Sequence, residues 1–590
     1  MDLAPPGVTT QVSANSALVI APHFDDDVLG CGGLIAQLTA AGAKVGVLFL
    51  ADGSGGVEEI ADRDAYAQRR HGEAARGLKI LGVTDIEFLD LPDGSLSAHV
   101  DEAAEAVRRA LVARRPDLLL AVSPLEISAD HRAAFAATHA VLSGLRGGTD
   151  LDAAVDGLEI LLYEANHPAF PDVLVDVSDK VDLVRSAIEA HASQLELHNY
   201  REVTLGLRSL RTASLSPVVT AAEGYRRLTV QDFVTSSRAG MIRRLGGVPE
   251  LHDVDDGPTI SVVVRTKDRP QLLAQALESL AAGTYRRVEV VLVNDGGKPP
   301  SVRDGFPFPV VMVNLPNNLG RAAAANAGVE KATGEWVAFL DDDDLAEPEH
   351  LATLAGLSAA AGTPVVYTDA AVGVYELDPQ SGWREVARRL PYSRDFDPEL
   401  LLFDNYIPFN TLLIERRLFD EIGPFDTGLE FFEDWDMLIR LAAAAPFHHW
   451  PQVTAEYRHF RGGDHILGER PTERADFLAM KARIIDKHRE LHSPEITARV
   501  IDRLRAEAVV AADTAAFRAT ELDSERRRFD GERAALNEAL NLHRIAIAEH
   551  DENAQRLHAE IERLNGLIKQ MEATKAWKLH RSIEKLRGRG

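Results

Sequence analysis

Short apolar runs alternate with helical patterns along the first 230 residues or so of the chain. Helical patterns cover, for example, residues 32–41 and 62–81. The expected strands between and around them are 17–21, 45–50, 117–122 and 158–163. This alternation predicts a mostly parallel sheet with helices on both faces. Sheets of this kind place their binding sites at the carboxyl ends of the strands.

A second alternation of the same kind begins near residue 258. Its expected strands are 259–264, 288–293, 309–313, 336–340 and 364–368. The stretch 238–257 before it is rich in glycine, proline and charge, which is typical of an interdomain linker. Because the two halves repeat the alternation without repeating any motif, we expect two different α/β domains, at 15–237 and 258–494.

Strands cease beyond about residue 495, where apolar residues follow the 3/4 spacing of a coiled-coil seam. The seam consists of Leu536, Leu540, Ile547, Ala554, Leu557, Ile561, Leu564, Ile568 and Met571, and is weakened by His543 and His550. We therefore expect 495–590 to be a helical tail that joins copies of the chain into a homo-oligomer. Its basic end, 575–590, carries Trp577, Leu579, Ile583 and Leu586. This end fits an anionic membrane surface or, equally well, a solvated helix end.

Composition narrows the classes of function. The chain has 590 residues, 45% of them hydrophobic and 26% charged, which is ordinary for a globular protein of two or three domains. Its net charge of −27 argues against general nucleic-acid binding. The single Cys31 excludes an intramolecular disulfide, and the first residues lack a secretory-signal pattern. No apolar run approaches the roughly 20 residues that span a bilayer. We expect a cytoplasmic protein whose tail is the candidate for peripheral contact with the inner face of the membrane.

The first expected strand leads directly into the acidic segment Pro22-His-Phe-Asp-Asp-Asp27. A second acidic cluster with a histidine, His131, follows the strand at 117–122. Histidine and aspartate both bind zinc, and catalytic zinc usually has three protein ligands. One histidine at a strand end is most often structural, but two such clusters at equivalent ends of parallel strands favour a metal site.

These segments resemble the PIG-L/LmbE zinc N-deacetylases. Residues 21–33, APHFDDDVLGCGG, are similar to the family's AHPDDE…GCGG signature. Further matches follow in order as LADG (50–53), RHGE (70–73), LGV (81–83), LPDG (91–94) and P…DH (124–131). The resemblance covers about residues 15–235 and implies an LmbE-like, Rossmann-like fold that binds Zn²⁺ through His23, Asp26 and His131. It also implies that Asp25 is the general base for the attacking water and that Arg70 and Asp93 contact the sugar.

Three positions depart from that pattern. Phe24 stands where the family has proline, and Asp27 where it has glutamate. Ser128 stands where the family often has histidine. If that histidine stabilises the oxyanion, the neutral Ser128 is a weaker substitute. The sequence therefore leaves open an active deacetylase or a degenerate domain that binds glycans.

The run Asp341-Asp-Asp-Asp344 directly follows the expected strand 336–340. Acid runs on solvated surfaces are common by chance in acidic proteins. Beside a buried strand, however, crowded carboxylates repel one another unless a cation compensates them. Hard cations such as Mg²⁺ and Mn²⁺ prefer carboxylate oxygens. Sugar transfer from a nucleotide donor uses such a cation to stabilise charge on the leaving group.

The neighbouring segments resemble the family-2 glycosyltransferases of GT-A fold. Five motifs occur in order: ISVVVRTKDRP (260–270), VLVNDGG (291–297), NNLGRAAAANAG (317–328), FLDDDD (339–344) and FEDWD (432–436). The resemblance implies a metal pair at Asp341 and Asp343, with Asp343 in direct contact with Mg²⁺ or Mn²⁺. Asp434 would be the catalytic base of an inverting transfer. The residues implied to bind the nucleotide sugar are Thr266, Asp268, Asp295, Arg321, Asn326 and Asp342, and Glu433 would bind the acceptor.

Four further positions near these motifs stay open. Arg458 and His459 are candidates for a metal or diphosphate contact, although a structural role for His459 is equally plausible and His465 competes with it. Arg265 stands where many relatives carry proline.

Together the motifs predict a bifunctional enzyme of glycan assembly. One domain would remove an N-acetyl group and the other would transfer a sugar from a nucleotide sugar to a glycan or glycosylated acceptor. One alternative is a glycosyltransferase with a degenerate, glycan-binding deacetylase-like domain. Another is a scaffold whose coiled coil tethers an assembly complex. The motifs do not specify the donor sugar, the acceptor or the acetylated substrate.

Overall fold

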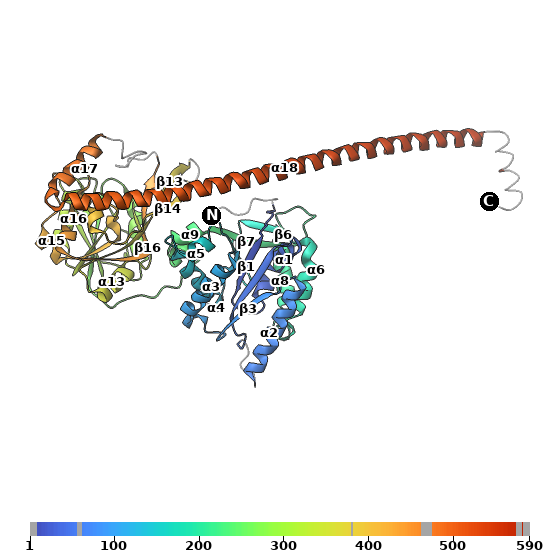
Figure 1. The fold of residues 1–590 in the computed structure, drawn as a ribbon, viewed down its shortest axis with the longest axis horizontal. Coiled ribbons are helices and arrows are strands. Elements are labelled where there is room, and N and C mark those ends of the chain that lie inside the picture. Colours follow the sequence, from blue (N-terminus) through green and yellow to red (C-terminus); the bar gives the residue numbers. More distant parts are fainter. Residues whose placement is uncertain (1–8, 56–61, 379–381, 462–474, 574–580, 582–590) are drawn as a thin grey trace. The chain divides into compact units, whose positions relative to one another are not determined.

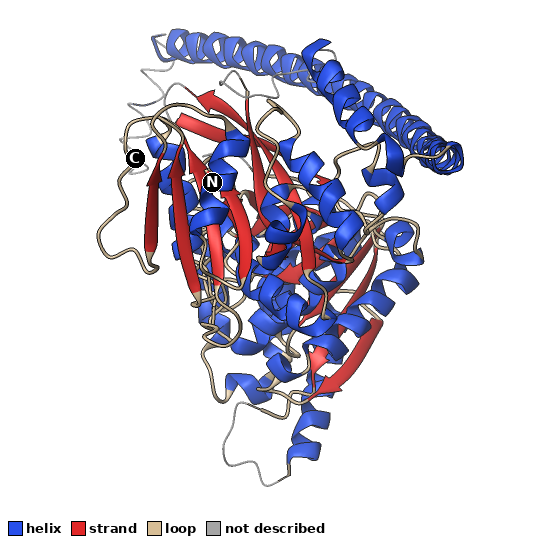
Figure 2. Cartoon of the chain, turned by 90° about the vertical axis from the view of Figure 1, so that its left-hand side faces the viewer, coloured by secondary structure: helices blue, strands red, loops and turns tan. Residues whose placement is uncertain are grey.

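The computed structural model describes residues 9–55, 62–378, 382–461, 475–573 and 581. The chain divides into two compact units, residues 1–492 and 493–590. The first unit holds two separate sheets, each packed between helices (Figures 1 and 2). This arrangement confirms the expectation of two α/β sheet domains.

In the part of the chain that the structure describes, the first sheet has seven strands in the order β3-β2-β1-β4-β5-β7-β6. The strands are β1 (Ser16–Ala21), β2 (Lys44–Ala51), β3 (Asp85–Leu91), β4 (Leu118–Val122), β5 (Glu159–Tyr163), β6 (Val173–Asp176) and β7 (Ala222–Thr229). The strands from β3 to β5 run parallel, whereas β7 pairs antiparallel with both of its neighbours, β5 and β6. The four strands expected from the apolar runs are β1, β2, β4 and β5, each within one residue of its expected bounds.

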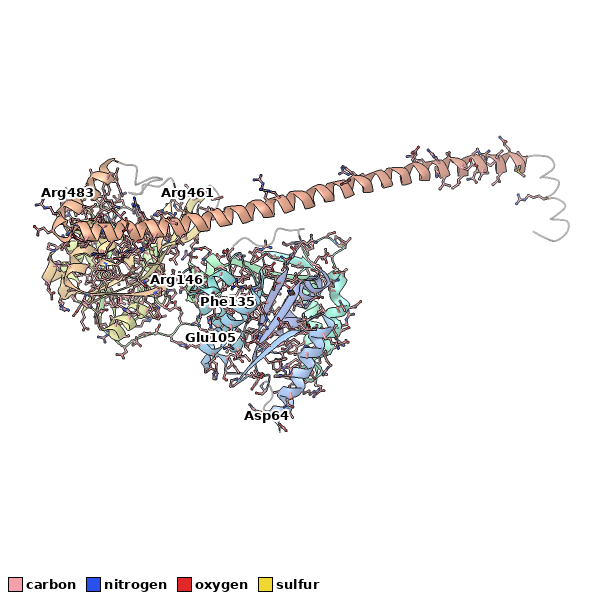
Figure 3. All side chains as sticks on the ribbon, in the orientation of Figure 1. Asp64, Glu105, Phe135, Arg146, Arg461 and Arg483 are labelled. Carbon is pink, nitrogen blue, oxygen red and sulfur yellow. The ribbon has the colours of Figure 1, made fainter. Side chains whose placement is uncertain are left out.

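Helices pack on this sheet. They are α1 (Asp26–Ala40), α2 (Arg63–Ile80), α3 (Val100–Arg114), α4 (Ala129–Ser143), α5 (Asp150–Ala154), α6 (Val181–Glu189), α7 (Ala192–Leu195), α8 (Tyr200–Leu210), α9 (Val230–Val234) and α10 (Arg238–Arg244). Phe135 of α4 is buried in the core, whereas Glu105 of α3 lies on the surface (Figure 3). Helix α10 falls in the expected linker, and Met241 and Leu245 pack into the first core. The first part of that segment is therefore a packed helix.

The second sheet has nine strands among the described residues. Eight follow the order β10-β9-β8-β11-β15-β13-β16-β12, and β14 pairs with β13. The strands are β8 (Ile260–Thr266), β9 (Val288–Asn294), β10 (Val310–Asn314), β11 (Trp336–Asp341), β12 (Leu345–Ala346), β13 (Val365–Asp378), β14 (Gly382–Tyr392), β15 (Leu412–Glu415) and β16 (Phe447–Phe460). The first four expected strands agree with β8, β9, β10 and β11 within two residues. The fifth, at 364–368, is only the start of the longer β13.

The helices of this sheet are α11 (Pro270–Ala281), α12 (Arg321–Lys331), α13 (His350–Ala361), α14 (Pro398–Leu401), α15 (Arg417–Ile422), α16 (Glu433–Ala444) and α17 (Ala475–Lys487). Helix α11 begins with Pro270, which is favoured at the first helical position because its missing N–H would be unpaired there.

Each sheet contains one point at which the order of the strands reverses. The chain passes from β1 to β2 and β3 on one side and then returns to β4 on the other side of β1. It likewise passes from β8 to β9 and β10 and returns to β11 beside β8. Connections that leave in opposite directions open a crevice at the carboxyl ends of the two central strands. Both acidic motifs lie at these points.

The second unit contains one long helix, α18 (Pro494–Ala573). Five side chains of the expected seam are exposed on it: Leu557, Ile561, Leu564, Ile568 and Met571. The helical prediction is thus confirmed over α18, whereas its pairing into a coiled coil stays a prediction. Trp577, Leu579, Ile583 and Leu586 lie outside the described residues. None of the helices that the structure describes combines the length and hydrophobicity needed to cross a bilayer.

Candidate active sites

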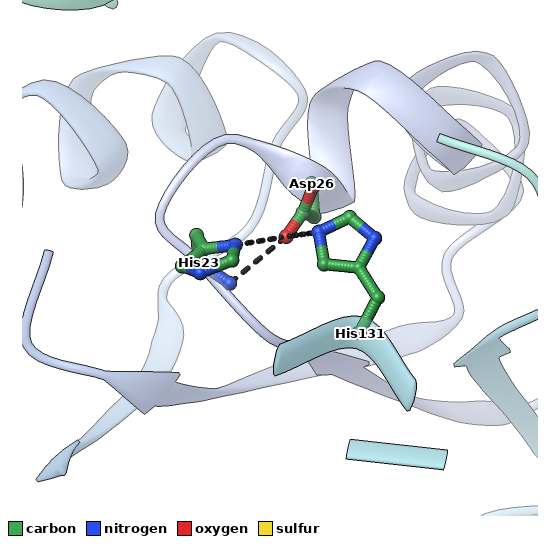
Figure 4. Close-up of side chains that lie close together, drawn as sticks. All are labelled: His23, Asp26 and His131. Atoms are coloured by element: carbon green, nitrogen blue, oxygen red, sulfur yellow. Dashed lines mark hydrogen bonds and ion pairs between the residues drawn. The ribbon is translucent and has the colours of Figure 1, made fainter. Parts of the chain in front are cut away.

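Three potential metal ligands meet at the carboxyl ends of β1 and β4. His23 precedes α1, Asp26 opens α1, and His131 lies in the first turn of α4. Asp26 Oδ2 is 3.1 Å from His23 Nδ1 and 3.1 Å from His131 Nε2 (Figure 4). The three ligand atoms lie within 4.8 Å of one another, so they could surround a single ion. The sequence prediction grouped these three residues, and the fold brings them together.

Each of the two histidines faces another carboxylate with its second ring nitrogen. His23 Nε2 is 3.3 Å from Asp130 Oδ2, and His131 Nδ1 is 3.4 Å from Glu126 Oε2. A carboxylate in this position fixes the tautomer and the orientation of a metal-binding histidine. Neither Asp130 nor Glu126 was predicted, although both belong to the strand-end segment 123–132 that supplied His131. Their acidic character next to that histidine was the available signal.

His23, Asp93 and Asp130 form a second group of potential ligands. Asp130 is already occupied there, because it accepts the backbone N–H groups of Gly94 at 2.7 Å and Leu96 at 3.1 Å. We therefore assign Asp130 to the orientation of His23 rather than to an ion of its own.

Arg70 connects the predicted base with the predicted sugar contact. Its Nη2 is 3.6 Å from Asp25 Oδ2, and its Nη1 is 3.5 Å from Asp93 Oδ2. Nη1 also donates to the carbonyl of Gly53 at 3.0 Å. The Arg70 guanidinium carbon lies 5.7 Å from the centre of the Phe24 ring. Phe24, which replaces the family's proline, is buried and thus helps to hold Arg70 in place.

The charges of this cluster are strongly coupled. Burial disfavours the cationic form of His131, but Asp26 and Glu126 outweigh burial and raise its pKa to about 9. Burial likewise opposes protonation of His23, whereas Asp130, Asp26 and Asp93 raise its pKa well above the usual value. Both pKa shifts favour protonated histidines in the metal-free cluster at neutral pH. An ion bound there must therefore displace protons.

Helix α1, which carries Asp26, is kinked. The helix departs from helical geometry at Cys31, and the N–H of Gly33 after the kink donates to Glu223 at 2.7 Å. Arg208 pairs with Glu223 at 2.5 Å and donates to the carbonyl of Leu29 before the kink at 3.0 Å. A buried ion pair thus satisfies the backbone groups that the kink leaves without helical partners.

At the second site, the acid run follows β11 as predicted, but arginines face it. Asp341 forms a two-pronged ion pair with Arg265, with both N–O distances at 2.7 Å. Arg321 Nη2 lies 3.3 Å from the same carboxylate. Burial opposes ionisation of Asp341, yet the two guanidinium groups lower its pKa. Two arginine side chains therefore balance the negative charge of Asp341, for which the sequence predicted a metal ion.

The middle of the run is bound by a third arginine. Arg269 Nη1 is 3.2 Å from Asp342 Oδ1 and 3.0 Å from Asp343 Oδ2. Thr266 donates to Asp342 Oδ2 at 2.7 Å. Burial and the neighbouring Asp343 raise the pKa of Asp342 to about 6.

Asp344 at the end of the run is buried and held by structural contacts. Its Oδ2 accepts from Asn410 at 2.9 Å, and its Oδ1 accepts from the backbone N–H of Arg458 at 3.3 Å. Asp344 thus ties the run to β16, as a supporting residue would. His459 packs against Tyr457 at a ring distance of 5.1 Å. His465 lies outside the described residues.

Glu433 and Asp434 open α16 beside these arginines. The residue before them, Phe432, has a φ of 64°, a left-handed backbone conformation that is strained for a bulky side chain. Glu433 is buried and lies 3.0 Å from Arg321 Nε and 3.2 Å from Arg265 Nη1. Burial and the adjacent Glu433 raise the pKa of Asp434. This shift makes Asp434 a stronger base than an ordinary aspartate.

Other predicted donor-binding residues organise the loops around the crevice. Asp295 accepts the N–H groups of Leu319 at 2.7 Å and Gly320 at 3.0 Å, just before α12. Asp268, with a φ of 54°, accepts the N–H of Lys298 at 2.9 Å.

Asn326, which was predicted to bind the nucleotide sugar, binds a backbone segment instead. Its side-chain amide binds both the N–H and the carbonyl of Phe425, at 2.7 and 2.9 Å. In this structure Asn326 therefore holds the loop at Phe425 against α12.

Comparisons with known proteins separate the two halves of the first unit. Residues 18–142 match the family of GlcNAc-PI de-N-acetylases (PIG-L), and residues 261–421 match glycosyl transferase family 2. YwdF of Bacillus subtilis strain 168, an uncharacterized glycosyltransferase, is 32% identical over 233 residues, 39% of this chain and 84% of that protein. The diacetylchitobiose deacetylase of Thermococcus kodakarensis is 34% identical over 186 residues, 30% of this chain and 69% of that protein. The chain belongs to both families.

The PIG-L and glycosyltransferase domains follow one another in a single polypeptide, and each match covers one of them. The chain is therefore an enzyme, a glycosyltransferase that also carries a PIG-L de-N-acetylase domain. Among solved structures, N,N'-diacetylchitobiose deacetylase from Pyrococcus horikoshii is similar at 24% identity and a TM-score of 0.34. That similarity covers 39% of this chain and 89% of that one.

The two sites differ in how well they fit a metal ion. In the PIG-L domain, two histidines and one aspartate converge, each histidine is oriented by a carboxylate, and the donor set suits zinc. In the glycosyltransferase domain, Arg265 occupies both oxygens of Asp341. Among the described residues, both groups of three potential ligands lie in the PIG-L domain. A cation at the acid run would thus need donor phosphate oxygens among its ligands.

Proposed function

We propose that the chain is a bifunctional enzyme of glycan assembly. The PIG-L domain removes an N-acetyl group from a sugar, and the glycosyltransferase domain transfers a sugar from a nucleotide-sugar donor with inversion. The main support is that each sheet gathers carboxylates and arginines at its switch point, with Asp25 beside Arg70 in the first and Glu433 beside Arg321 in the second. The presence of both domains in one chain favours two steps of one pathway and does not require a shared substrate.

In the proposed deacetylation, Asp25 takes a proton from the attacking water. Asp25 lies 3.6 Å from Arg70, which orients the carboxylate. Arg70 and Asp93 hold the sugar hydroxyls. Zinc held by His23, Asp26 and His131 would polarise the acetamide carbonyl and lower the pKa of water.

The substrate class of this reaction is proposed as a glycan ending in an N-acetylglucosamine-type sugar. The T. kodakarensis relative is a diacetylchitobiose deacetylase by name, and the chain covers 69% of it. Ser128, at the start of α4, would have to donate a hydrogen bond to the oxyanion where many relatives use histidine. A neutral donor stabilises an oxyanion less than a cationic one does.

In the proposed transfer, Asp434 takes the proton of the acceptor hydroxyl, and the attacking oxygen displaces the diphosphate from the opposite face. Asp295 and Thr266 would contact the nucleotide, and Glu433, next to the base in the chain, would bind the acceptor. The guanidinium of Arg321 stabilises negative charge on the departing diphosphate. A divalent cation, Mg²⁺ or Mn²⁺, would share that charge when bound to the acid run together with the donor.

Two assays test this proposal. Zinc-loaded chain is incubated with N,N'-diacetylchitobiose and with N-acetylglucosamine, and acetate release is measured for the wild type and for His131→Ala. We expect acetate release that the variant loses. Stoichiometric zinc without acetate release from any N-acetyl sugar tested would favour the degenerate, glycan-binding alternative.

The second assay measures nucleoside diphosphate release from UDP-, GDP- and dTDP-sugars with Mn²⁺ and a set of glycan acceptors. We expect release from at least one donor, lost in Asp434→Asn. If no donor is consumed under any condition, the scaffold alternative gains support.

A further inference from the structure

A pocket of about 320 Å³ lies beside the metal cluster of the PIG-L domain, and this volume is within the range of small-molecule sites. Its walls come from the loop after β4, the loop after β5 and the end of α10 with the residues that follow it. Because β1, β4 and β5 are neighbouring parallel strands, the first two loops leave the same edge of the sheet that carries the metal cluster. Glu126 lines the pocket, and its carboxylate is also 3.4 Å from His131 Nδ1. One side chain thus connects the pocket wall with a predicted metal ligand.

Two buried glutamates hold the loop after β5 in place. Glu126 accepts the backbone N–H of Ala165 at 2.8 Å. Glu164 accepts the backbone N–H of Ala169 at 2.8 Å and the Nε–H of Arg211 at 2.7 Å. These contacts fix both ends of the segment that lines the pocket.

The third wall is a property of the chain after the family match, which ends at residue 142. Helix α10 ends in a glycine cap, in which Gly246 has a φ of 90° and the N–H of Gly247 donates to the carbonyl of Ile242 at 2.9 Å. A Cβ atom on Gly247 would lie 2.4 Å from the side chain of Leu125. The cap therefore turns the chain closely against the loop after β4.

The wall side chains that face water are apolar. Ile127, Phe170 and Val248, one from each of the three segments, are 72%, 51% and 93% exposed. Apolar side chains that gather on a surface mark a site of interaction, whereas single ones need no explanation. The pocket is therefore suited to an apolar group.

Three of the four polar side chains in the wall already have partners. Arg132 pairs with Glu250 at 2.8 Å and donates to the backbone carbonyls of Glu126, at 3.2 Å, and Ile127. Glu126 binds the loop after β5, and His167 is the fourth polar residue. A sugar ring needs several hydrogen-bond partners, so this wall favours an apolar group over a second sugar.

We infer that the pocket binds an apolar group attached to the N-acetyl sugar, so that the PIG-L domain favours N-acetylglucosaminides with an apolar aglycone. The position of the pocket beside the metal cluster makes its occupant a part of the same substrate. The binding free energy of such a group grows with the apolar area that leaves water. This inference rests on the proposed deacetylation and names the substrate class more closely.

The test compares three substrates of the zinc-loaded full chain: methyl and hexyl β-N-acetylglucosaminide and N,N'-diacetylchitobiose. We expect kcat/KM for acetate release to be at least about tenfold higher for the hexyl than for the methyl glycoside. Equal values for these two glycosides would overturn the inference. A preference for diacetylchitobiose over the hexyl glycoside would also overturn it, because the pocket would then bind a sugar.

Two valines give a matched pair of variants. Val248→Asp places a charge in the pocket wall and should reduce the ratio of hexyl to methyl kcat/KM at least about fivefold. Val218 is 81% exposed and lies outside the pocket, so Val218→Asp should keep the wild-type ratio. Phe170→Ser should act like Val248→Asp. Wild-type ratios in Val248→Asp and Phe170→Ser would exclude the pocket as the origin of the preference.

Equilibrium dialysis with the hexyl and methyl glycosides adds a readout that needs no turnover. If the hexyl glycoside binds at least about tenfold tighter and Val248→Asp removes this gain, but no acetate is released from any substrate, only the proposed deacetylation fails. If acetate is released from the methyl and hexyl glycosides with equal efficiency, only the inference fails. If the chain neither binds nor deacetylates any of the three compounds, both fail.

Discussion

Single carboxylates in this chain differ in role because their neighbours differ. Asp341 is paired with two arginines that lower its pKa. Asp434 lies near the same arginines, but burial and the adjacent Glu433 outweigh them and raise its pKa. Residue type and spacing can suggest that an aspartate is catalytic, but only its partners decide which task it can perform.

The first prediction concerns Asp434. Asp434→Asn should lower kcat for sugar transfer by about 10²–10⁴-fold, because the acceptor loses its base. Donor affinity should stay within about threefold, since the change is nearly isosteric. Because the pKa of Asp434 is raised, the wild-type rate should rise with pH through that value as the base loses its proton, and then level off. Steady-state kinetics between pH 4 and 8 measure both effects, and a variant that keeps more than about a tenth of the rate would refute the assignment.

The second prediction concerns Glu126, which orients His131. Glu126→Gln should weaken zinc binding by about 10–100-fold, because the amide no longer holds the ring nitrogen as a carboxylate does. A competition titration against a fluorescent chelator measures the affinity. Glu105→Gln on the surface of α3 is the control. Glu126 also accepts the backbone N–H of Ala165 at 2.8 Å. Equal zinc affinity in the two variants would mean that Glu126 only anchors the loop at Ala165.

At the scale of elements, the helix α1 depends on close approaches that only glycine allows. A Cβ atom on Gly30 would lie 2.2 Å from the ring of Tyr163, whereas one on Gly32 would have ordinary contacts from 3.6 Å. Gly30→Ala should therefore destabilise the PIG-L domain by about 1–3 kcal/mol, and Gly32→Ala should be nearly neutral. Urea unfolding of both variants checks this, and equal stabilities would contradict the close packing of α1 against β5.

A buried histidine predicts acid sensitivity of the same domain. Burial lowers the pKa of His139 to about 4, against about 6.5 for an unfolded chain. Between these values the unfolded chain binds a proton that the folded chain does not. Stability should therefore fall by about 2 kcal/mol from pH 7 to pH 5 through this group. His139→Gln should lose that part of the pH dependence in urea unfolding, and an unchanged dependence would exclude His139 as its source.

Strands with a local pattern were predictable from the sequence, whereas strands that depend on distant pairing were not. The residues that form β1, β4, β8 and β11 are short, apolar runs that are buried. These strands and the sites at their ends were therefore predictable. The hairpin of β13 and β14 was missed, because β14 is largely exposed and lacks a buried run. Arg265 was noted only as a departure from the family, because its pairing with Asp341 depends on the register between β8 and β11.

At the scale of the whole molecule, the exposed stripe on α18 predicts self-association. Its side chains Ile561 and Ile568 are 54% and 53% exposed. Such a stripe is stable in water when a second helix covers it. Ile561→Asp should therefore shift the full chain toward monomer in analytical ultracentrifugation. Leu567→Asp, an equally drastic change beside the seam, should have a smaller effect, and a wild type that is monomeric at micromolar concentration would refute the coiled coil.

The most direct test of the central claim measures two products on one preparation. Wild-type chain, His131→Ala and Asp434→Asn are each assayed for acetate release from N-acetyl sugars and for nucleoside diphosphate release from nucleotide sugars. The proposed bifunctional enzyme predicts that the wild type releases both products, that His131→Ala loses only acetate, and that Asp434→Asn loses only the nucleoside diphosphate. A wild-type chain that releases one product or neither, or variants that do not separate the two activities, would contradict it.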